Sequence, residues 1–141
     1  MMRPRLLDLF CGAGGAAMGW VRAPMPMRME VSWAAGFFDG EGYVGVRRDK
    51  RAGRNPTLQI GIEQVRLEPL VRFAKAVQWD GNILLRPTKR APERQKIHRL
   101  IMGHEDTVQT MMFLWPYLCE PKQEQFLKAA KEVDDATSKV A

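Results

Sequence analysis

Two acidic side chains, Asp39 and Glu41, stand at the end of a segment that reads Trp-Ala-Ala-Gly-Phe-Phe-Asp-Gly-Glu-Gly over residues 33–42. The small residues of this segment predict a helix that a second helix can approach backbone to backbone. Carboxylate oxygens are the ligands that hard divalent cations such as Mg²⁺ prefer. The segment therefore predicts that an acidic side chain is delivered to the end of a helix–helix contact, where it can hold a metal ion.

The residues that follow predict the strands and helices that would hold this segment in place. A strand is predicted over residues 43–50, and residues 57–64 alternate, with Leu58, Ile60 and Ile62 on one face and polar residues on the other. A charged turn joins the two strands into a half-buried hairpin. The later pattern predicts, in order, a helix that Pro69 opens, a second hairpin over residues 82–87 and 94–102, and two helices over residues 105–115 and 122–135.

Residues 34–42 resemble the signature of the LAGLIDADG homing endonucleases, position for position. The predicted order of elements over residues 31–135 also resembles the αββαββα arrangement of that family. The resemblance implies an α+β fold in which four antiparallel strands form a saddle over DNA, while the helices cover the other face of the sheet.

The resemblance also assigns roles to individual residues. Glu41 matches the signature position that binds the catalytic metal ion, with the backbone carbonyl of Gly40 as a further ligand. Asp39 is expected to shape the turn, with a direct metal role as the alternative. Gln64 matches a glutamine that positions water in the site, and Lys122 resembles the lysine that stabilises charge or tunes the attacking water.

The implied activity is that of a sequence-specific homing endonuclease, which makes double-strand breaks in DNA with Mg²⁺ or Mn²⁺. Because the signature occurs once, a paired acidic site arises only in a homodimer, and a two-fold protein reads a long, near-palindromic site. Ala34, Ala35 and Phe38 are expected to line the dimer interface. Two alternatives with the same fold remain open: an RNA-binding intron maturase, and a catalytically inactive DNA-binding module.

The distribution of charge favours a polyanionic partner. The formal net charge is +6, and residues 43–102 hold 14 Lys or Arg against 5 Asp or Glu, whereas residues 103–141 hold 4 against 7. Gln59 is suited to read adenine, and arginines can grip guanine edges. The predicted DNA-binding set comprises Gln59 together with the basic residues Arg47, Arg48, Lys50, Arg51, Arg54, Arg86, Lys89, Arg90, Arg94, Lys96 and Arg99.

The N-terminal segment carries a second resemblance. Residues 5–19 form an apolar strand and a glycine-rich turn that resemble the first motif of the DNA (cytosine-5) methyltransferases. One strand and one turn cannot build a cofactor pocket, so no S-adenosylmethionine is expected to bind. We interpret residues 1–30 as a poorly ordered methyltransferase-like remnant with a junction at 21–30, and residues 31–141 as the endonuclease domain. The hypothesis is that an endonuclease reading frame entered a methyltransferase gene.

The remaining features exclude several other classes. No apolar run is long enough to span a membrane, and no secretion signal is evident, so we expect a cytoplasmic or organellar protein without a membrane partner. Cys11 and Cys119 show neither metal-ligand spacing nor a disulfide framework. His98 and His104 are lone histidines, for which a surface or phosphate contact is expected rather than a catalytic role.

Overall fold

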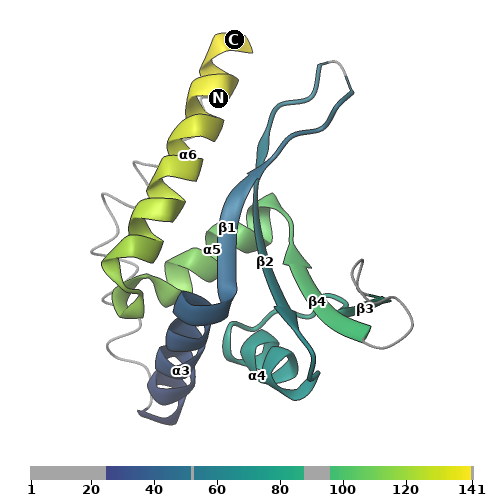
Figure 1. The fold of residues 1–141 in the computed structure, drawn as a ribbon. Coiled ribbons are helices and arrows are strands. Elements are labelled where there is room, and N and C mark those ends of the chain that lie inside the picture. Colours follow the sequence, from purple (N-terminus) through teal and green to yellow (C-terminus); the bar gives the residue numbers. More distant parts are fainter. Residues whose placement is uncertain (1–24, 52, 88–95, 141) are drawn as a thin grey trace.

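The computed structural model describes residues 25–51, 53–87 and 96–140. Its elements lie in the order helix, two strands, helix, two strands, helix, short helix and long helix (Figure 1). Their bounds are α3 (Met25–Glu41), β1 (Gly42–Arg47), β2 (Thr57–Gln64), α4 (Glu68–Ala76), β3 (Leu84–Pro87), β4 (Lys96–Met102), α5 (His104–Leu114), the 3₁₀ helix η1 (Trp115–Tyr117) and α6 (Glu120–Val140). The predicted α+β class and order of elements are confirmed.

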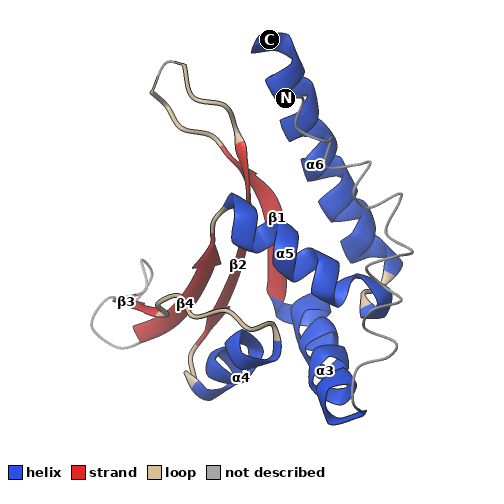
Figure 2. Cartoon of the chain, turned by 180° about the vertical axis from the view of Figure 1, so that it is seen from behind, coloured by secondary structure: helices blue, strands red, loops and turns tan. Residues whose placement is uncertain are grey.

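The four strands form one antiparallel sheet in the order β1-β2-β4-β3. Side chains of successive strand residues point to opposite faces, so the register assigns each position to one of two faces. One face carries the buried Val44, Ile60 and Leu100 and lies against the helices, as the views from front and back show (Figures 1 and 2). The opposite face, which begins with Tyr43 on β1 and includes Gly61 on β2, is called the open face below.

The core lies between the helices and the sheet. Phe38 of α3, Phe73 of α4 and Phe126 of α6 are fully buried, and the rings of Phe38 and Phe73 lie 6.1 Å apart. Burying each such side chain contributes about 1.5–3 kcal/mol, so these three rings join three helices into one core. On the surface, Arg72 of α4 forms two hydrogen bonds with Glu30 of α3, which lower the pKa of that carboxyl.

Side chains of α5 accept hydrogen bonds from the backbone at the beginning of β2. The ladder between β2 and β4 starts at Ile60, so the N–H groups at the beginning of β2 need other acceptors. His104 Nδ1 accepts from Leu58 N at 3.0 Å, and Thr107 Oγ1 accepts from Ile60 N at 3.1 Å. His104 is therefore a structural residue of the β2–α5 junction, and the expected surface or phosphate contact is wrong for it.

Element bounds differ most from the sequence predictions at the first helix. Helix α3 begins at Met25, so residues 25–30, which the sequence places in the junction, are helical. Pro26 falls in the first turn, where a missing N–H leaves no hydrogen bond unmade. The methyltransferase-like motif at residues 5–19 lies outside the described residues.

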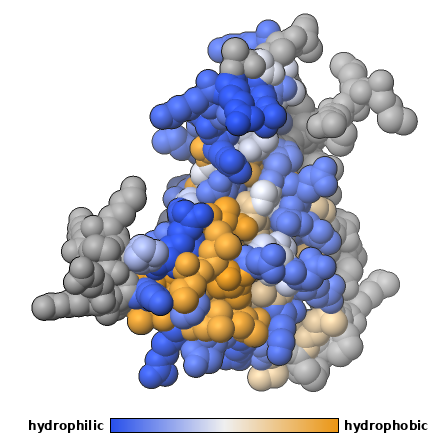
Figure 3. Space-filling model, turned by 90° about the vertical axis from the view of Figure 1, so that its right-hand side faces the viewer, coloured by the Kyte–Doolittle hydropathy of each residue, from blue (hydrophilic) through white to orange (hydrophobic). Residues whose placement is uncertain are grey.

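The face of the molecule that Figure 3 shows carries a hydrophobic area among hydrophilic side chains. The upper part of the face in Figure 3 is strongly hydrophilic, and the β1–β2 loop lies at the same height in Figure 1. A hydrophobic area lies below it, and the large apolar side chains exposed in the described chain include Val65, Leu67, Leu84 and Leu85. None of the helices that the structure describes is long and apolar enough to cross a membrane.

Candidate functional site

Glu41 and Gln64 meet where α3 runs directly into the sheet. Glu41 is the last residue of α3, and the next residue, Gly42, pairs with Ile62 of β2. This register brings Gln64, the last residue of β2, beside Glu41, and Gln64 Nε2 donates a hydrogen bond to Glu41 Oε2 at 2.8 Å. Gln64 thereby orients the exposed carboxylate of Glu41. Within the described part of the chain, the other carboxylate oxygen, Glu41 Oε1, remains available for a further ligand.

Lys122 joins the same place from the far end of the chain. It lies in the first turn of α6, and its Nζ donates to the carbonyl oxygen of Gly42 at 2.6 Å. Nζ also lies 5.3 Å from the centre of the Phe38 ring, within the range of a cation–π contact. Partial burial lowers the pKa of the ammonium group, and the negative charge of Asp39 opposes this effect.

Asp39 holds the start of α6. Both of its carboxylate oxygens accept a hydrogen bond from the backbone N–H of Cys119, at 3.2 and 3.1 Å. The Cys119 carbonyl in turn accepts from the backbone N–H groups of Lys122 and Gln123, the first turn of α6. Asp39 thus fixes the segment that carries Lys122, and its contact also raises the pKa of the Cys119 thiol.

Polar and basic side chains gather on the open face of the sheet. The register places Arg47, Gln59, Arg86 and Arg99 on this face, as the DNA-binding prediction requires. Lys96 alternates to the other face, so the expectation that it shares the surface of Arg86 and Arg99 is wrong. The open face also carries one acid, Glu63, whose carboxylate lies 2.9 Å from Arg99 Nε.

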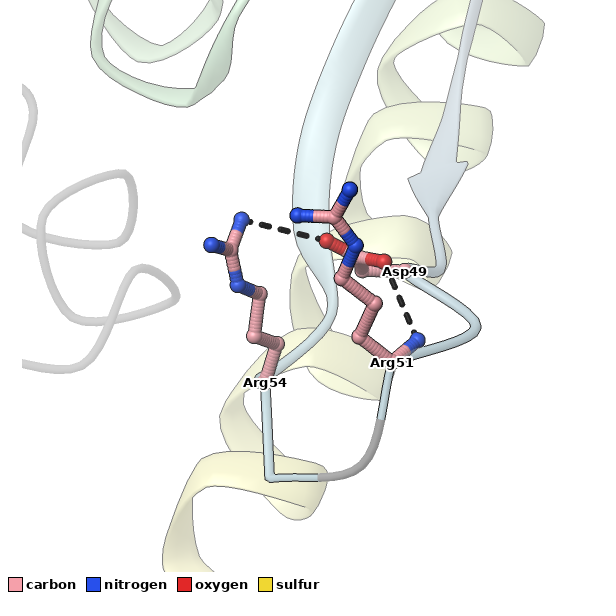
Figure 4. Close-up of polar contacts among 3 residues, drawn as sticks. All are labelled: Asp49, Arg51 and Arg54. Atoms are coloured by element: carbon pink, nitrogen blue, oxygen red, sulfur yellow. Dashed lines mark hydrogen bonds and ion pairs between the residues drawn. The ribbon is translucent and has the colours of Figure 1, made fainter.

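Asp49 organises the β1–β2 loop. Its carboxylate accepts from the backbone N–H of Arg51 at 3.1 Å and from the Arg54 guanidinium at 3.2 Å (Figure 4). Gly53 has φ of +86°, a left-handed conformation that glycine adopts readily. Arg48 is directed elsewhere, because its guanidinium forms an ion pair with Glu132 of α6.

Comparisons with known proteins support the fold alone. No protein-family model and no curated protein sequence matches the chain. Among solved structures, the LAGLIDADG homing endonuclease I-LtrWI bound to target DNA matches with a TM-score of 0.60 and 19% identity, over 79% of this chain and 39% of that one. I-CvuI in complex with the I-CreI target matches at 0.56 and 16% identity, over 77% and 69% of the two chains. The group I intron-encoded homing endonuclease I-CeuI complexed with DNA matches at 0.56 and 9% identity, over 95% and 71%.

This chain has the LAGLIDADG homing endonuclease fold. It spans well under half the length of I-LtrWI, so one copy of the fold here corresponds to part of that longer protein. Glu41, Gln64 and Lys122 come from three separate elements of this fold and are brought to one junction by it. Of the predicted DNA-binding set, Lys89, Arg90 and Arg94 lie outside the described residues.

Structures of I-CvuI with target DNA were obtained in the presence of Mg and of Ca, and the donor atoms at the α3–β1 junction of this chain suit such an ion. Glu41 offers a carboxylate and Gly40 a neighbouring carbonyl, and both residues are exposed. Hard cations take about six oxygen ligands, and no cluster of three or more His, Cys, Asp or Glu side chains occurs in the described part of the chain. Glu41 and Gly40 therefore supply oxygen atoms of the kind that such an ion binds.

The dimer face predicted for α3 is corrected by the burial of its residues. Ala34, Ala35 and Phe38 are fully buried in the core of their own protomer, so a second copy cannot contact them without opening that core. The exposed side of the helix carries Ser32 and, at successive turns, Gly36 and Gly40. A Cβ added to either glycine would meet no atom within 4 Å. This stripe of small residues is the face that another helix could approach.

Tyr43 is a residue of the open face that the DNA-binding prediction omits. Its hydroxyl accepts a hydrogen bond from Gln59 Nε2 at 3.1 Å, and the side chain is 38% exposed. The alternation of β1 offered a signal, because Tyr43 and Arg47 are four residues apart and therefore share a face.

His98 also has a partner, since its Nδ1 lies 3.0 Å from the carbonyl oxygen of Val65.

Proposed function

We propose that the chain is a site-specific DNA endonuclease that acts as a homodimer and requires a divalent cation. The observation that carries this proposal is the meeting of Glu41, Gln64 and Lys122 at the α3–β1 junction of a fold shared with DNA-bound homing endonucleases. An exposed carboxylate oriented by one polar partner, with a cation at the adjacent carbonyl, suits phosphodiester hydrolysis.

Each residue at the junction has a distinct task. Glu41 Oε1 and the Gly40 carbonyl would hold Mg²⁺ or Mn²⁺, and structures of I-CvuI with DNA were obtained in the presence of Mg and of Ca. A bound divalent cation lowers the pKa of water and stabilises negative charge on phosphate oxygens. Gln64 keeps the Glu41 carboxylate in one orientation. Lys122 supplies positive charge, which stabilises the negative charge that develops on the phosphate during cleavage.

Two copies of the chain complete the site. One protomer offers a single exposed carboxylate at this junction, and cleavage of two strands needs two such groups. The exposed stripe of Ser32, Gly36 and Gly40 ends next to Glu41, so helices that pack along it bring both Glu41 side chains to the same end of the contact. A dimer with two-fold symmetry reads a target with near-palindromic halves.

The target we propose is an uninterrupted methyltransferase gene at the codons that match residues 5–19. The experiment incubates the full chain and Mg²⁺ with a plasmid that carries this sequence, and compares the wild type with Glu41→Gln. We expect specific double-strand cleavage by the wild type, and binding without cleavage by the variant. Glu105→Gln is the matched control, because Glu105 is an exposed acid on α5, away from the junction.

Two results would contradict the proposal. Cleavage by Glu41→Gln at the wild-type rate would show that this carboxylate is not required. DNA binding by the wild type without cleavage in Mg²⁺ or Mn²⁺ would identify an inactive DNA-binding module instead, and preference for a structured intron RNA over the duplex would identify the RNA-binding alternative.

A further inference from the structure

We propose that Tyr43, Gln59 and Gly61 form a preorganised unit that reads an adenine–thymine base pair in each half of the target. The inference rests on the proposed DNA-binding function and names residues that determine its specificity. It rests on the register of β1 and β2, the hydrogen bond between Gln59 and Tyr43, and the close approach of the Tyr43 ring to the backbone of Gly61.

The three residues lie together on the open face. Tyr43 of β1 is directly opposite Gly61 of β2, and Gln59 precedes Gly61 by two residues on the same face. Arg47 lies farther along β1 on this face, and Arg99 lies on β4. A two-stranded antiparallel ribbon fits the major groove, where base edges carry a distinct pattern of donors and acceptors. The unit is therefore placed where base reading takes place.

Gly61 makes room for the tyrosine ring. A Cβ at this position would lie 2.5 Å from Cε1 and 2.7 Å from Cζ of Tyr43, closer than carbon atoms approach without a shift. Glycine is otherwise unfavourable inside a strand, and it marks sites where another group approaches the backbone closely. The absence of a side chain at Gly61 lets the ring approach the backbone of β2, with its hydroxyl reaching Gln59.

The hydrogen bond to Tyr43 fixes the amide of Gln59 in a reading position. Gln59 Nε2 donates one of its two hydrogens to the Tyr43 hydroxyl at 3.1 Å, which leaves one N–H and the Oε1 acceptor for a ligand. A donor beside an acceptor matches adenine, which presents the N7 acceptor and the N6 amino group in the major groove. Guanine presents two acceptors there, so Oε1 would face an oxygen. The unit therefore selects adenine against guanine.

Preorganisation explains why the tyrosine contributes. A long glutamine side chain loses rotamer freedom when it binds, and part of that loss occurs before binding if a neighbour already holds the amide. Tyr43 is thus a positioning residue for Gln59, and Gln59 is the residue that touches the base. Removal of the hydroxyl should loosen selectivity at one position without weakening contacts elsewhere.

The experiment measures cleavage by the full-length protein against a set of targets in which each base pair is replaced in turn. The wild type should discriminate at one adenine–thymine pair in each half-site by about 5- to 150-fold, the range of a bidentate base contact. Tyr43→Phe should lose most of this discrimination at that pair and leave the other positions unchanged. Gln59→Ala should lose it completely, and the double variant should be no worse than Gln59→Ala alone.

Two further variants separate a specific effect from a general loss of structure. Gly61→Ala forces the Tyr43 ring away from β2, so it should lose discrimination at the same pair as Tyr43→Phe. Tyr117→Phe is the matched control, since it removes the hydroxyl of the only other tyrosine, which lies in η1. Thermal unfolding of each variant confirms that it is folded.

The outcomes distinguish this inference from the proposed function. Unchanged discrimination by Tyr43→Phe, or an equal loss at every position, would overturn the inference while the nuclease activity stands. Loss of discrimination at a guanine–cytosine pair would overturn the adenine assignment. Binding of duplex DNA without cleavage would overturn the proposed nuclease, and the same target set would then test the reading unit by affinity. Failure of the wild type to bind any duplex would overturn both.

Discussion

Asp39 and Glu41 are two residues apart, yet the structure gives them different partners. Glu41 receives a hydrogen bond from the side chain of Gln64, whereas Asp39 receives its bonds from the backbone before α6. A carboxylate whose oxygens accept hydrogen bonds from a backbone N–H stabilises that segment and has fewer lone pairs available to bind a metal ion. Glu41 is therefore the acid available for the proposed catalysis, whereas Asp39 stabilises the segment that carries Lys122.

Substitutions of Asp39 test this separation. Asp39→Ala leaves the Cys119 N–H without its protein acceptor and should lower the free energy of unfolding by about 1 kcal/mol, whereas Asp39→Asn keeps an acceptor oxygen and should lower it by less than half of that. Chemical denaturation gives these values, and cleavage assays give the activities. Loss of cleavage by Asp39→Asn as complete as that of Glu41→Gln, with stability unchanged, would mean that Asp39 is itself a metal ligand.

The lowered pKa of Lys122 predicts a pH dependence for cleavage. Burial disfavours the ammonium form, so the cation is lost at a lower pH than for an ordinary lysine, and cleavage should fall as the pH rises through that lowered pKa. Lys122→Arg should move the fall to higher pH, because arginine stays protonated. Lys122→Met should reduce the rate about 100-fold at neutral pH.

The measurement is the single-turnover cleavage rate across the alkaline range at constant ionic strength. Lys128→Arg is the matched control, since Lys128 lies on α6 with an exposed side chain. An identical alkaline limb for the wild type and Lys122→Arg would show that a different group titrates.

Strand β2 and helix α3 differ in how much of their packing the sequence pattern determines. The alternation of β2 predicts its bounds residue for residue, since Leu58, Ile60 and Ile62 must share the buried face. The helix of the signature carries small residues on two sides, and composition alone cannot tell which side faces the core. Helix α3 packs against α4, α5, η1 and the sheet, with its alanine side buried and its glycine side left exposed.

The site residues also divide into those that the sequence indicates and those that only the tertiary structure reveals. Glu41, Gln64 and Lys122 could be singled out because each matches a position of the family that the sequence resembles. The partner of Asp39 could not, because the Cys119 N–H lies 80 residues away and becomes an orphan donor only when α6 docks. Tyr43 gained its place from cross-strand pairing with Gly61, a register that sequence alone does not fix.

A bulky residue on the exposed side of α3 should separate the proposed dimer. Gly36→Leu adds a side chain where the protomer has open space, so the fold is kept or gains helix propensity of up to about 1 kcal/mol. Two helices that pack along this stripe would be forced apart, and sedimentation should show monomers that no longer make double-strand breaks. Lys131→Leu, an exposed position on α6, is the control and should stay dimeric. Dimers of Gly36→Leu with full activity would place the interface elsewhere.

Charge is distributed unevenly over the described chain: Arg47, Arg86 and Arg99 lie on the open face, further basic residues lie in the β1–β2 loop, and the C-terminal part is acidic. Residues 43–102 hold 14 Lys or Arg, whereas residues 103–141 hold more acids than bases. Such a molecule approaches a polyanion with one side, and each phosphate it neutralises releases counterions. Affinity for DNA should therefore fall steeply as the salt concentration rises.

The slope of that fall should depend on how each loop arginine is held. Arg51 has an exposed side chain, and Asp49 engages its backbone N–H, so Arg51→Ala should reduce the slope of log affinity against log salt by about one. Arg48 is paired with Glu132 of α6, so Arg48→Ala should reduce the slope by less, and Glu132→Gln should raise affinity by releasing Arg48 for phosphate. Fluorescence anisotropy with a labelled duplex over a salt series measures all three. Equal slopes for Arg48→Ala and Arg51→Ala, with no gain from Glu132→Gln, would mean that the ion pair with α6 does not restrain the loop when DNA is bound.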